Sequence, residues 1–334
     1  MRVVPPSHTH AQVSGMGIAL PEQVVKNSDL EKRLDTSDEW IVTRTGIRER
    51  RIADKDVATS DLCIAAAEEA LRDAEISASD LDLVVICTVT PDNPVPATAC
   101  MVQNRLGAKK AGAFDLSAGC TGFMYGLAVG SQFIETGFYQ RVLVIGADML
   151  SRITNWEDRS TAVLFGDGAG AFVLTPSSKE GYGLLKFRLK ADGSGAPFLM
   201  VEAGGTRIPA SEKTVKNLQH YLKMEGRPVF KFAVNAILDG VLEVLKQENL
   251  TIEDIDCFIF HQANVRILEN AAKQLKIPME KVFTNVERYG NTSSASVPLA
   301  LYEARQEKKF KRGSYVLMVG YGAGLTWGSA LMRW

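Results

Sequence analysis

The sequence lacks the features that mark several large classes of protein. Its formal net charge is −1, so there is no basic excess to hold nucleic acid and no polybasic tail to hold an anionic membrane. No apolar run approaches the roughly 20 residues that a membrane-spanning helix needs. The first twelve residues contain no apolar segment of the signal-peptide kind. We therefore expect a cytoplasmic protein that binds neither nucleic acid nor membrane.

Cysteine and histidine are too few and too scattered for a disulfide framework or a metal centre. The cysteines are odd in number and form no Cys-x-x-Cys pair, and the four histidines form no His-x-x-x-His pair. The glycine-rich segments 167–170 and 320–324 lack the P-loop lysine and the dinucleotide-binding order. We expect both to be tight turns where the backbone approaches another segment closely. The sequence thus shows no motif for a metal ion or a nucleotide.

What the chain does contain is an internal repeat. Its 334 residues suggest about two domains, and its 46% of hydrophobic residues is ordinary for a globular protein. Residues 76–87 can be laid on residues 250–261, and residues 141–146 on residues 315–320. Both matches have the same offset, 174 residues, so they are unlikely to be chance.

Each half repeats one order of elements, which predicts an α/β fold. In the first half we expect a helix at 60–74, a buried strand at 83–87, a second strand-like segment at 112–116, a small-residue helix at 120–135 and a third strand at 142–145. In the second half we expect the same elements, in the same order, at 232–248, 258–260, 282–285, 293–307 and 316–319. Apolar strands alternating with helices indicate mostly parallel sheets that are covered on both faces. Two such halves would pack into five layers, αβαβα. We place the boundary near residues 176–183, which gives halves 1–182 and 183–334.

Three polar residues follow predicted strands, where α/β proteins collect their active groups. Cys120 opens a helix, whose N-terminus should lower the pKa of the thiol and offer N–H groups to an oxyanion; no other cysteine is expected at such a place. His261 and Asn291 follow strands of the second half. Taken singly, Cys120 could be a buried structural cysteine, His261 a histidine packed in the core, and Asn291 a turn residue. Together they indicate a cleft shared by the two halves.

Cysteine, histidine and asparagine also form the catalytic set of papain-like proteases. There the asparagine orients the histidine, and the histidine deprotonates the cysteine. The α/β duplication and the apolar helix after Cys120 count against this alternative.

Six segments of the sequence resemble one family. They are residues 35–50, the segment around Cys120, and residues 165–171, 261–266, 290–296 and 325–331. In this order they resemble β-ketoacyl-acyl carrier protein synthase III, the initiating condensing enzyme of bacterial type II fatty-acid synthesis, which has the thiolase fold. The resemblance extends from about residue 12 to the C-terminus.

The resemblance implies a condensation of an acyl-CoA primer with malonyl-acyl carrier protein to give 3-oxoacyl-acyl carrier protein. Cys120 would carry the acyl group. His261 and Asn291 would donate hydrogen bonds to the enolate formed by decarboxylation, and the backbone N–H groups of Cys120 and Ala323 would hold the oxyanion. The reaction needs no cofactor or metal, and the family is homodimeric.

Binding residues follow from the same resemblance. The CoA-binding residues would be Trp40, Arg44, Arg159, Phe230 and Asn264. The carrier protein would meet Lys231, Arg266 and Lys273, and Val95 would reach the acyl pocket of the partner subunit. Val95 stands where some members have a bulky aromatic residue, Ala323 where some have glycine, and residues 199–223 are longer than in the shortest members. The primer is therefore left open between acetyl and short or branched acyl groups.

Alternatives within and beyond the superfamily remain. A secondary-metabolite acyltransferase would share these motifs. A hydroxymethylglutaryl-CoA synthase would need a glutamate base, and none is evident beside them. A non-catalytic acyl-binding protein would be expected to lose one of Cys120, His261 or Asn291, and all three are present.

Overall fold

A computed structural model describes residues 9–334, which form two large β-sheets and two small two-stranded ones, β2–β3 and β9–β10. The first has the order β1-β7-β6-β4-β5 and consists of β1 (Ala11–Ala19), β4 (Leu83–Cys87), β5 (Gly112–Leu116), β6 (Val142–Met149) and β7 (Asp167–Pro176). The second has the order β11-β12-β13-β8 and consists of β8 (Gly183–Ala191), β11 (Cys257–Phe260), β12 (Tyr315–Gly322) and β13 (Thr326–Arg333). Every strand of the first sheet thus precedes every strand of the second.

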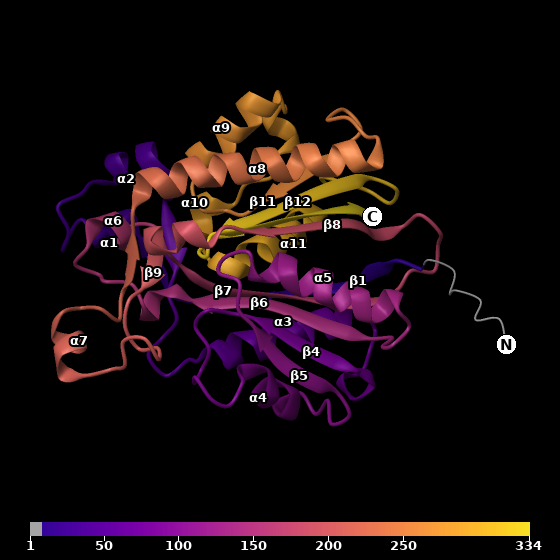
Figure 1. Cartoon of the computed structure of the whole chain (residues 1–334), viewed down its shortest axis with the longest axis horizontal. Coiled ribbons are helices and arrows are strands. Elements are labelled where there is room, and N and C mark those ends of the chain that lie inside the picture. Colours follow the sequence, from indigo (N-terminus) through magenta and orange to yellow (C-terminus); the bar gives the residue numbers. More distant parts are fainter. Residues whose placement is uncertain (1–8) are drawn as a thin grey trace.

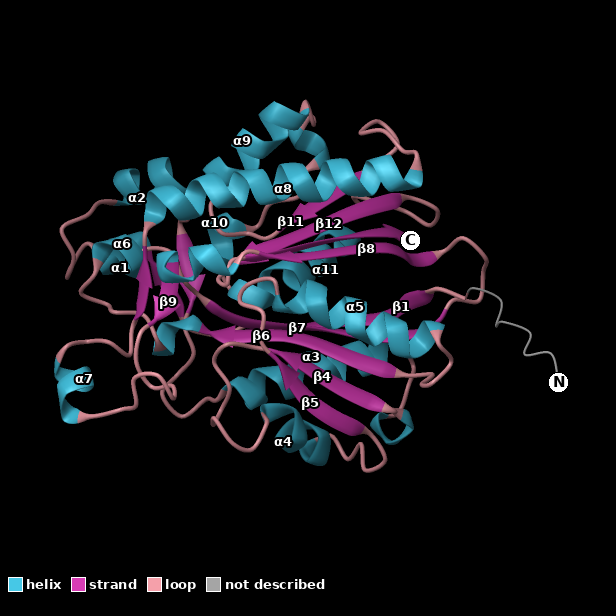
Figure 2. Ribbon diagram, viewed as in Figure 1, coloured by secondary structure: helices cyan, strands magenta, loops and turns pink. Residues whose placement is uncertain are grey.

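Helices cover and separate the sheets in five layers (Figures 1 and 2). The outer layers are α3 (Thr59–Asp73) with α4 (Thr98–Arg105), and α8 (Gly226–Glu248) with α9 (Val265–Leu275). The central layer, α5 (Gly122–Glu135) with α11 (Ser296–Gln306), contacts both sheets. Because α5 lies between two sheets, it is apolar nearly all round, and Phe123, Met124 and Leu127 are completely buried. The predicted thiolase fold with its αβαβα layers is confirmed.

The repeat in the sequence is a repeat in the topology. β4 and β11, like β6 and β12, hold equivalent places in the two sheets and lie 174 residues apart in the sequence. The two edge strands β1 and β8 pair antiparallel with β7 and β13. The division at residue 182 stays a prediction, although β7 ends at Pro176 and β8 begins at Gly183.

Three expectations about local structure were wrong. The sheets are not mostly parallel: β4–β5, β4–β6 and β11–β12 are parallel, but β1–β7, β6–β7, β12–β13 and β13–β8 are antiparallel, since β7 and β13 turn back beside the strands that precede them. Residues 282–285 do not form a strand and contribute one isolated bridge, Phe258 to Val282. The segment 167–170 lies inside β7 and is not a turn.

The shorter elements lie around one end of the sheets. They are β2 (Val24–Lys26), α1 (Asn27–Leu30), α2 (Asp38–Thr45), β3 (Glu49–Arg51), α6 (Arg159–Ala162), β9 (Leu199–Val201), α7 (Glu212–Lys216), β10 (Leu222–Met224) and α10 (Val286–Tyr289). β9 and β10 pair antiparallel and carry α7 between them as an excursion from the body of the protein (Figure 1). Within residues 9–334, no helix is long and apolar enough to cross a membrane.

A buried carboxylate joins the two halves near the ends of these strands. Asp148, at the end of β6, is inaccessible to solvent. One of its oxygens accepts hydrogen bonds from Thr88 Oγ1 (3.0 Å), Val89 N–H (2.7 Å) and Thr90 Oγ1 (3.2 Å). The other accepts from the N–H (3.0 Å) and the hydroxyl (2.6 Å) of Ser294, which belongs to the second half. The five donors satisfy the buried charge and fix Ser294 against the first sheet.

Replacing Asp148 with asparagine should destabilise the protein. One of the two acceptor oxygens would become an amide NH₂ group, which donates. At least one buried donor would then lose its acceptor, which costs about 2–4 kcal/mol in the free energy of unfolding. We expect a lower denaturant midpoint for Asp148→Asn, with Glu68→Gln on the exposed face of α3 as the matched control. Equal midpoints for the two variants would show that this carboxylate does not hold the halves together.

Candidate active site

The site begins where backbone from the two halves is in direct contact. Gly119 has a left-handed φ of 58°, and a Cβ there would lie 2.9 Å from the nitrogen of Ala323. A Cβ on Gly322 would lie 2.6 Å from the nitrogen of Cys120. Neither clash can be relieved by a side-chain movement, because backbone atoms stand in the way, so both positions require glycine. The Thr326 hydroxyl adds a hydrogen bond to the carbonyl of Ala118 (2.8 Å).

Cys120 lies just before α5 and faces a cavity, with three donors around its sulfur. The Ser293 hydroxyl donates to Sγ at 3.3 Å, and the backbone N–H groups of Cys120 and Ala323 also point at it. Burial nevertheless raises the pKa of the Cys120 thiol to about 11. We expected the helix end to lower this pKa, and that expectation was wrong because the second half covers the thiol. The two N–H groups belong to the residues predicted for the oxyanion hole, and that role stays a prediction.

His261 follows β11 and is almost completely buried. Burial lowers the pKa of the imidazole to about 3, so the ring is neutral at physiological pH. Its Nδ1 is hydrogen-bonded to the Ser296 hydroxyl, whose oxygen already accepts the Gln262 N–H at 3.3 Å. When the neutral ring carries its proton on Nε2, Nδ1 accepts this bond from the hydroxyl. Tyr321 packs edge-on against the ring and donates its phenol to the His261 carbonyl (2.9 Å).

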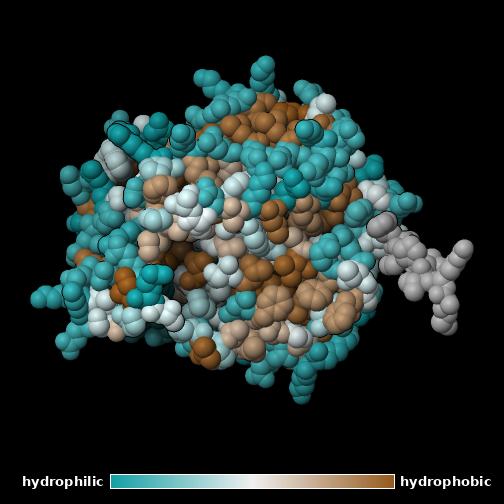
Figure 3. Space-filling model, in the orientation of Figure 1, coloured by the Kyte–Doolittle hydropathy of each residue, from teal (hydrophilic) through white to brown (hydrophobic). Residues whose placement is uncertain are grey.

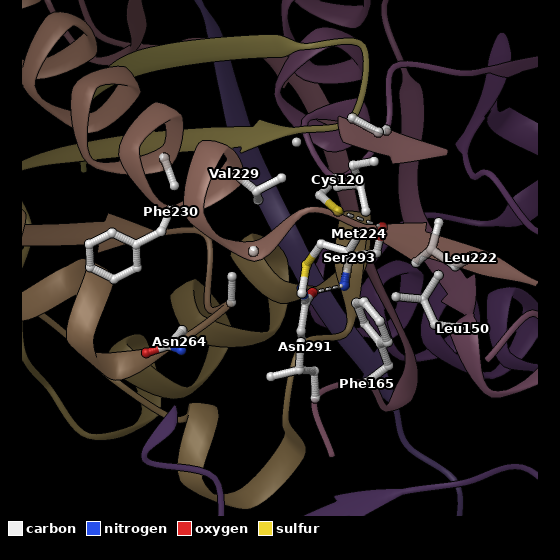
Figure 4. Close-up of a pocket in the computed structure, with 18 of the residues that line it drawn as sticks. Cys120, Leu150, Phe165, Leu222, Met224, Val229, Phe230, Asn264, Asn291 and Ser293 are labelled. Atoms are coloured by element: carbon white, nitrogen blue, oxygen red, sulfur yellow. Dashed lines mark hydrogen bonds between the residues drawn. The ribbon is translucent and has the colours of Figure 1, made fainter. Parts of the chain in front are cut away.

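Asn291 is held by its backbone and by one side-chain oxygen. Its N–H donates to the Leu164 carbonyl (2.8 Å), and its carbonyl accepts from the Gly166 N–H (3.0 Å), so the segment pairs with the first half. Its Oδ1 accepts from the N–H of Ser293 at 2.8 Å (Figure 4). This bond orients the amide and leaves the two Nδ2 protons available to a ligand in the cavity.

One cavity brings the predicted catalytic groups together. It has a volume of about 460 Å³, and Cys120, His261, Asn291 and Ala323 all line it. Figure 3 shows that one face of the molecule is hollowed and hydrophobic. Apolar side chains supply much of the wall. Leu199 and Val201 belong to β9, Leu222 and Met224 belong to β10, and segments earlier in the chain contribute Leu150, Ile153 and Phe165. The cavity thus offers a few polar groups at one point of an apolar tunnel.

The predicted CoA-binding residues gather at the mouth of the same cavity, which Trp40, Arg44, Phe230 and Asn264 line. The guanidinium carbon of Arg159 lies 4.8 Å from the Trp40 ring, and that of Arg44 lies 6.0 Å away. Arg159 is beside the mouth but does not line it, and it donates to the Asp35 carbonyl (2.6 Å). Asn264 has a structural task as well, since it caps α9 through the Arg266 N–H (2.9 Å).

The remaining predicted residues lie outside the cavity. Lys231 on α8 and Arg266 and Lys273 on α9 are exposed, and none of the three forms an ion pair with any residue from 9 to 334. Val95, between β4 and α4, is 84% exposed. Residues 9–334 contain no group of three or more His, Cys, Asp and Glu side chains that could hold a metal ion.

The sequence analysis missed several residues that hold the site. Ser293 and Ser296 contact Cys120 and His261, and Asp148 anchors the segment between them. The serines belong to the quoted segment 290–296, of which only the asparagine was singled out, and they lie in the expected helix 293–307. The expectation that no other cysteine stands at a helix N-terminus was also wrong, because the exposed Cys100 is the third residue of α4.

Comparisons with known proteins agree on one family. The profile "3-Oxoacyl-[acyl-carrier-protein (ACP)] synthase III" matches residues 114–193, and the profile of its C-terminal part matches residues 245–334. A beta-ketoacyl-[acyl-carrier-protein] synthase III from Caldanaerobacter subterraneus subsp. tengcongensis is 54% identical over 97% of this chain and 98% of its own length.

Solved structures give the same result. The crystal structure of 3-oxoacyl-[acyl-carrier-protein] synthase III from Aquifex aeolicus VF5 is 47% identical, with a TM-score of 0.89 over 97% of this chain and 100% of its own. The priming beta-ketosynthase from the R1128 polyketide biosynthetic pathway is 35% identical, with a TM-score of 0.90 over 99% of this chain and 98% of its own. The chain belongs to the β-ketoacyl-acyl carrier protein synthase III family of condensing acyltransferases.

Proposed function

We propose that Cys120, His261 and Asn291 carry out the family's condensation of an acyl-CoA primer with malonyl-acyl carrier protein. One observation carries the proposal. A single apolar cavity holds a thiol, two backbone N–H groups aimed at it, a neutral imidazole and an amide. A nucleophile beside an oxyanion site, with two neutral donors opposite, suits a reaction that passes through two anions.

In the first stage the Cys120 thiolate attacks the carbonyl carbon of the acyl-CoA. The carbonyl oxygen becomes an oxyanion and accepts hydrogen bonds from the N–H groups of Cys120 and Ala323. The bond between the carbonyl carbon and the CoA sulfur then breaks. CoA leaves as a thiolate that takes a proton from water, and the acyl group remains on Cys120 as a thioester.

In the second stage the malonyl group loses carbon dioxide. The electrons of the broken carbon–carbon bond form an enolate, whose oxygen accepts hydrogen bonds from His261 Nε2 and Asn291 Nδ2. His261 suits this role because the low pKa that burial gives it keeps the ring neutral. A neutral ring can donate from Nε2 without handing its proton to the enolate carbon. The carbon then attacks the acyl group, and Cys120 leaves as a thiolate.

The surroundings of the cavity support the binding of both substrates. Trp40, flanked by two guanidinium groups, can stack on a purine while Arg44 and Arg159 meet phosphates, and Phe230 and Asn264 line the path inward. The exposed Lys231, Arg266 and Lys273 offer unpaired positive charge to an acidic carrier protein. No cofactor takes part in the proposed steps, and a cytoplasmic location stays a prediction.

Exposed apolar groups support a homodimer. Val95 is 84% exposed, and β5 is the edge strand of the first sheet. An apolar groove on α5 is lined by Ala128, Val129, Phe133 and Leu189, and the neighbouring Phe138 is 69% exposed. Figure 3 shows hydrophobic side chains gathered on this face. A second copy of the chain would cover such surface, and the loop that carries Val95 would then reach the partner's acyl pocket.

The two donors should act on decarboxylation more than on acylation. His261→Ala or Asn291→Ala removes a hydrogen bond to the enolate, which typically costs about 10²–10³ in rate. We expect that loss in the release of carbon dioxide from malonyl-acyl carrier protein, while mass spectrometry shows a much smaller loss in the acylation of Cys120. A variant that decarboxylated at the parent rate but could not be acylated would reverse the assignment.

The size of Val95 should set primer preference in a dimer. A valine is smaller than an aromatic residue, so the pocket floor should lie deeper, and butyryl-CoA or a branched primer should compete with acetyl-CoA. One methylene in an apolar pocket is worth about 1–3 kcal/mol, so selectivity should be graded. We expect Val95→Phe to shift kcat/KM toward acetyl-CoA, and Val215→Phe, on the exposed α7, to leave it unchanged.

The solution mass decides whether this reasoning applies. A monomer would remove its basis, since Val95 could then reach no partner. A dimer in which Val95→Phe left the acetyl, butyryl and isobutyryl ratios unchanged would show that other residues set the depth of the pocket.

A further inference from the structure

Ser293 contacts the reacting sulfur yet has no part in the mechanism above. Its hydroxyl donates to Cys120 Sγ at 3.3 Å (Figure 4). Within residues 9–334, no other acceptor lies within hydrogen-bonding distance of this hydroxyl. The residue is inaccessible from the outer surface, and it lines the cavity beside Cys120. The bond is therefore a fixed feature of the site.

The backbone holds this hydroxyl in place at some cost. Ser293 has a φ of 54°, a left-handed value that residues with a Cβ adopt reluctantly. Its N–H is bound to Asn291 Oδ1, and the next residue, Ser294, is fixed by the buried carboxylate of Asp148. Strained conformations of this kind persist where the surroundings over-determine them, and they cluster at functional sites.

The sulfur needs such a donor because the site holds no charged group that could stabilise a thiolate. Burial raises the pKa of the Cys120 thiol, and the nearby Asp148 raises it further. His261 is neutral and engages Ser296 through Nδ1. The hydroxyl of Ser293 and the backbone N–H groups of Cys120 and Ala323 act in the opposite direction and favour the ionised form of this thiol. Of these three, the hydroxyl alone can be removed by substitution.

We propose that Ser293 is a further catalytic residue, whose hydroxyl stabilises the Cys120 thiolate by donating a hydrogen bond to its sulfur. The inference rests on the proposed function only in taking Cys120 as the acyl carrier. When Cys120 ionises, its proton passes to water and Ser293 keeps its own. The bond strengthens as charge develops on sulfur, so it favours the attacking thiolate and the thiolate expelled in the condensation. It weakens once the sulfur is acylated, which leaves the thioester free to react.

The reactivity of Cys120 toward iodoacetamide tests this without any acyl-CoA. We would compare the full chain with Ser293→Ala and with Ser293→Gly, which suits the left-handed φ and protects against misfolding. Removing the hydroxyl can only widen access to the sulfur, so slower alkylation reports a less stable thiolate. A lost hydrogen bond to a charged group should lower the thiolate fraction about tenfold or more. Because a more basic thiolate is also a better nucleophile, we expect alkylation about three- to tenfold slower.

Two controls show whether the change in reactivity is confined to Cys120. Alkylation is measured at each cysteine by peptide mass mapping, and the exposed Cys100 in the first turn of α4 should react at its parent rate. Ser131→Ala, which removes a buried hydroxyl without a partner from α5, should leave the reactivity of Cys120 unchanged. Parent or faster alkylation of Cys120 in both Ser293 variants, or an equal slowing at Cys100, would overturn the proposal.

A second measurement separates catalysis from positioning. If Ser293 only held Asn291 in place, its substitution would slow malonyl decarboxylation and leave alkylation of Cys120 at the parent rate. We expect the loss in alkylation to exceed the loss in decarboxylation, measured in a Cys120→Ala background that lacks the sulfur. Should the chain prove unable to use acyl-CoA, the proposed function would fail while the alkylation rates still decided the role of Ser293.

Discussion

The site depends on the direct contact of two backbone segments that lie far apart in the sequence. Gly119 and Cys120 follow a strand of the first half, and Gly322 and Ala323 lie at the end of a strand of the second. A Cβ added to Gly119 or Gly322 would clash with the backbone of the other segment. Because the segments touch, the N–H groups of Cys120 and Ala323 converge on one sulfur. A gap of even one methyl group would separate these donors and open the interface between the halves. The site is thus formed where the two halves of the fold meet, after β5 in the first and at the end of β12 in the second.

Neutral groups do most of the electrostatic work at this contact. His261 is held neutral by burial, Asn291 is an amide, and the donors aimed at the Cys120 sulfur are two backbone N–H groups and a hydroxyl. Hydrogen bonds from such groups are strong in an apolar cavity and require little reorganisation when an anion forms. The buried carboxylate of Asp148 accepts hydrogen bonds from five donors, so it fixes the geometry of the contact between the halves. The same burial raises the pKa of the Cys120 thiol, so the site must offset the cost of forming the thiolate.

The sequence alone predicted the layered fold and the three lining residues, because both follow from strand ends in a repeated pattern. Cys120, His261 and Asn291 were found by their places after apolar strands, and the structure brings them into one cavity. Strand direction was missed because periodicity does not record which way a strand runs. The pKa of Cys120 was predicted in the wrong direction because its burial comes from the other half of the chain. Ser293 and Asp148 escaped notice because a serine at the start of a helix and an aspartate at the end of a strand have many plainer uses, and only their distances reveal their roles.

The central claim is that this cavity transfers an acyl group from CoA to one sulfur. Brief incubation of the full chain with acetyl-CoA, butyryl-CoA or isobutyryl-CoA, followed by intact-mass measurement and peptide mapping, tests it most directly. The account predicts one acyl group per chain, located on Cys120 and absent from Cys120→Ala. A stable acyl group on Cys63, Cys87, Cys100 or Cys257, or no adduct with any of the three acyl-CoAs, would contradict it.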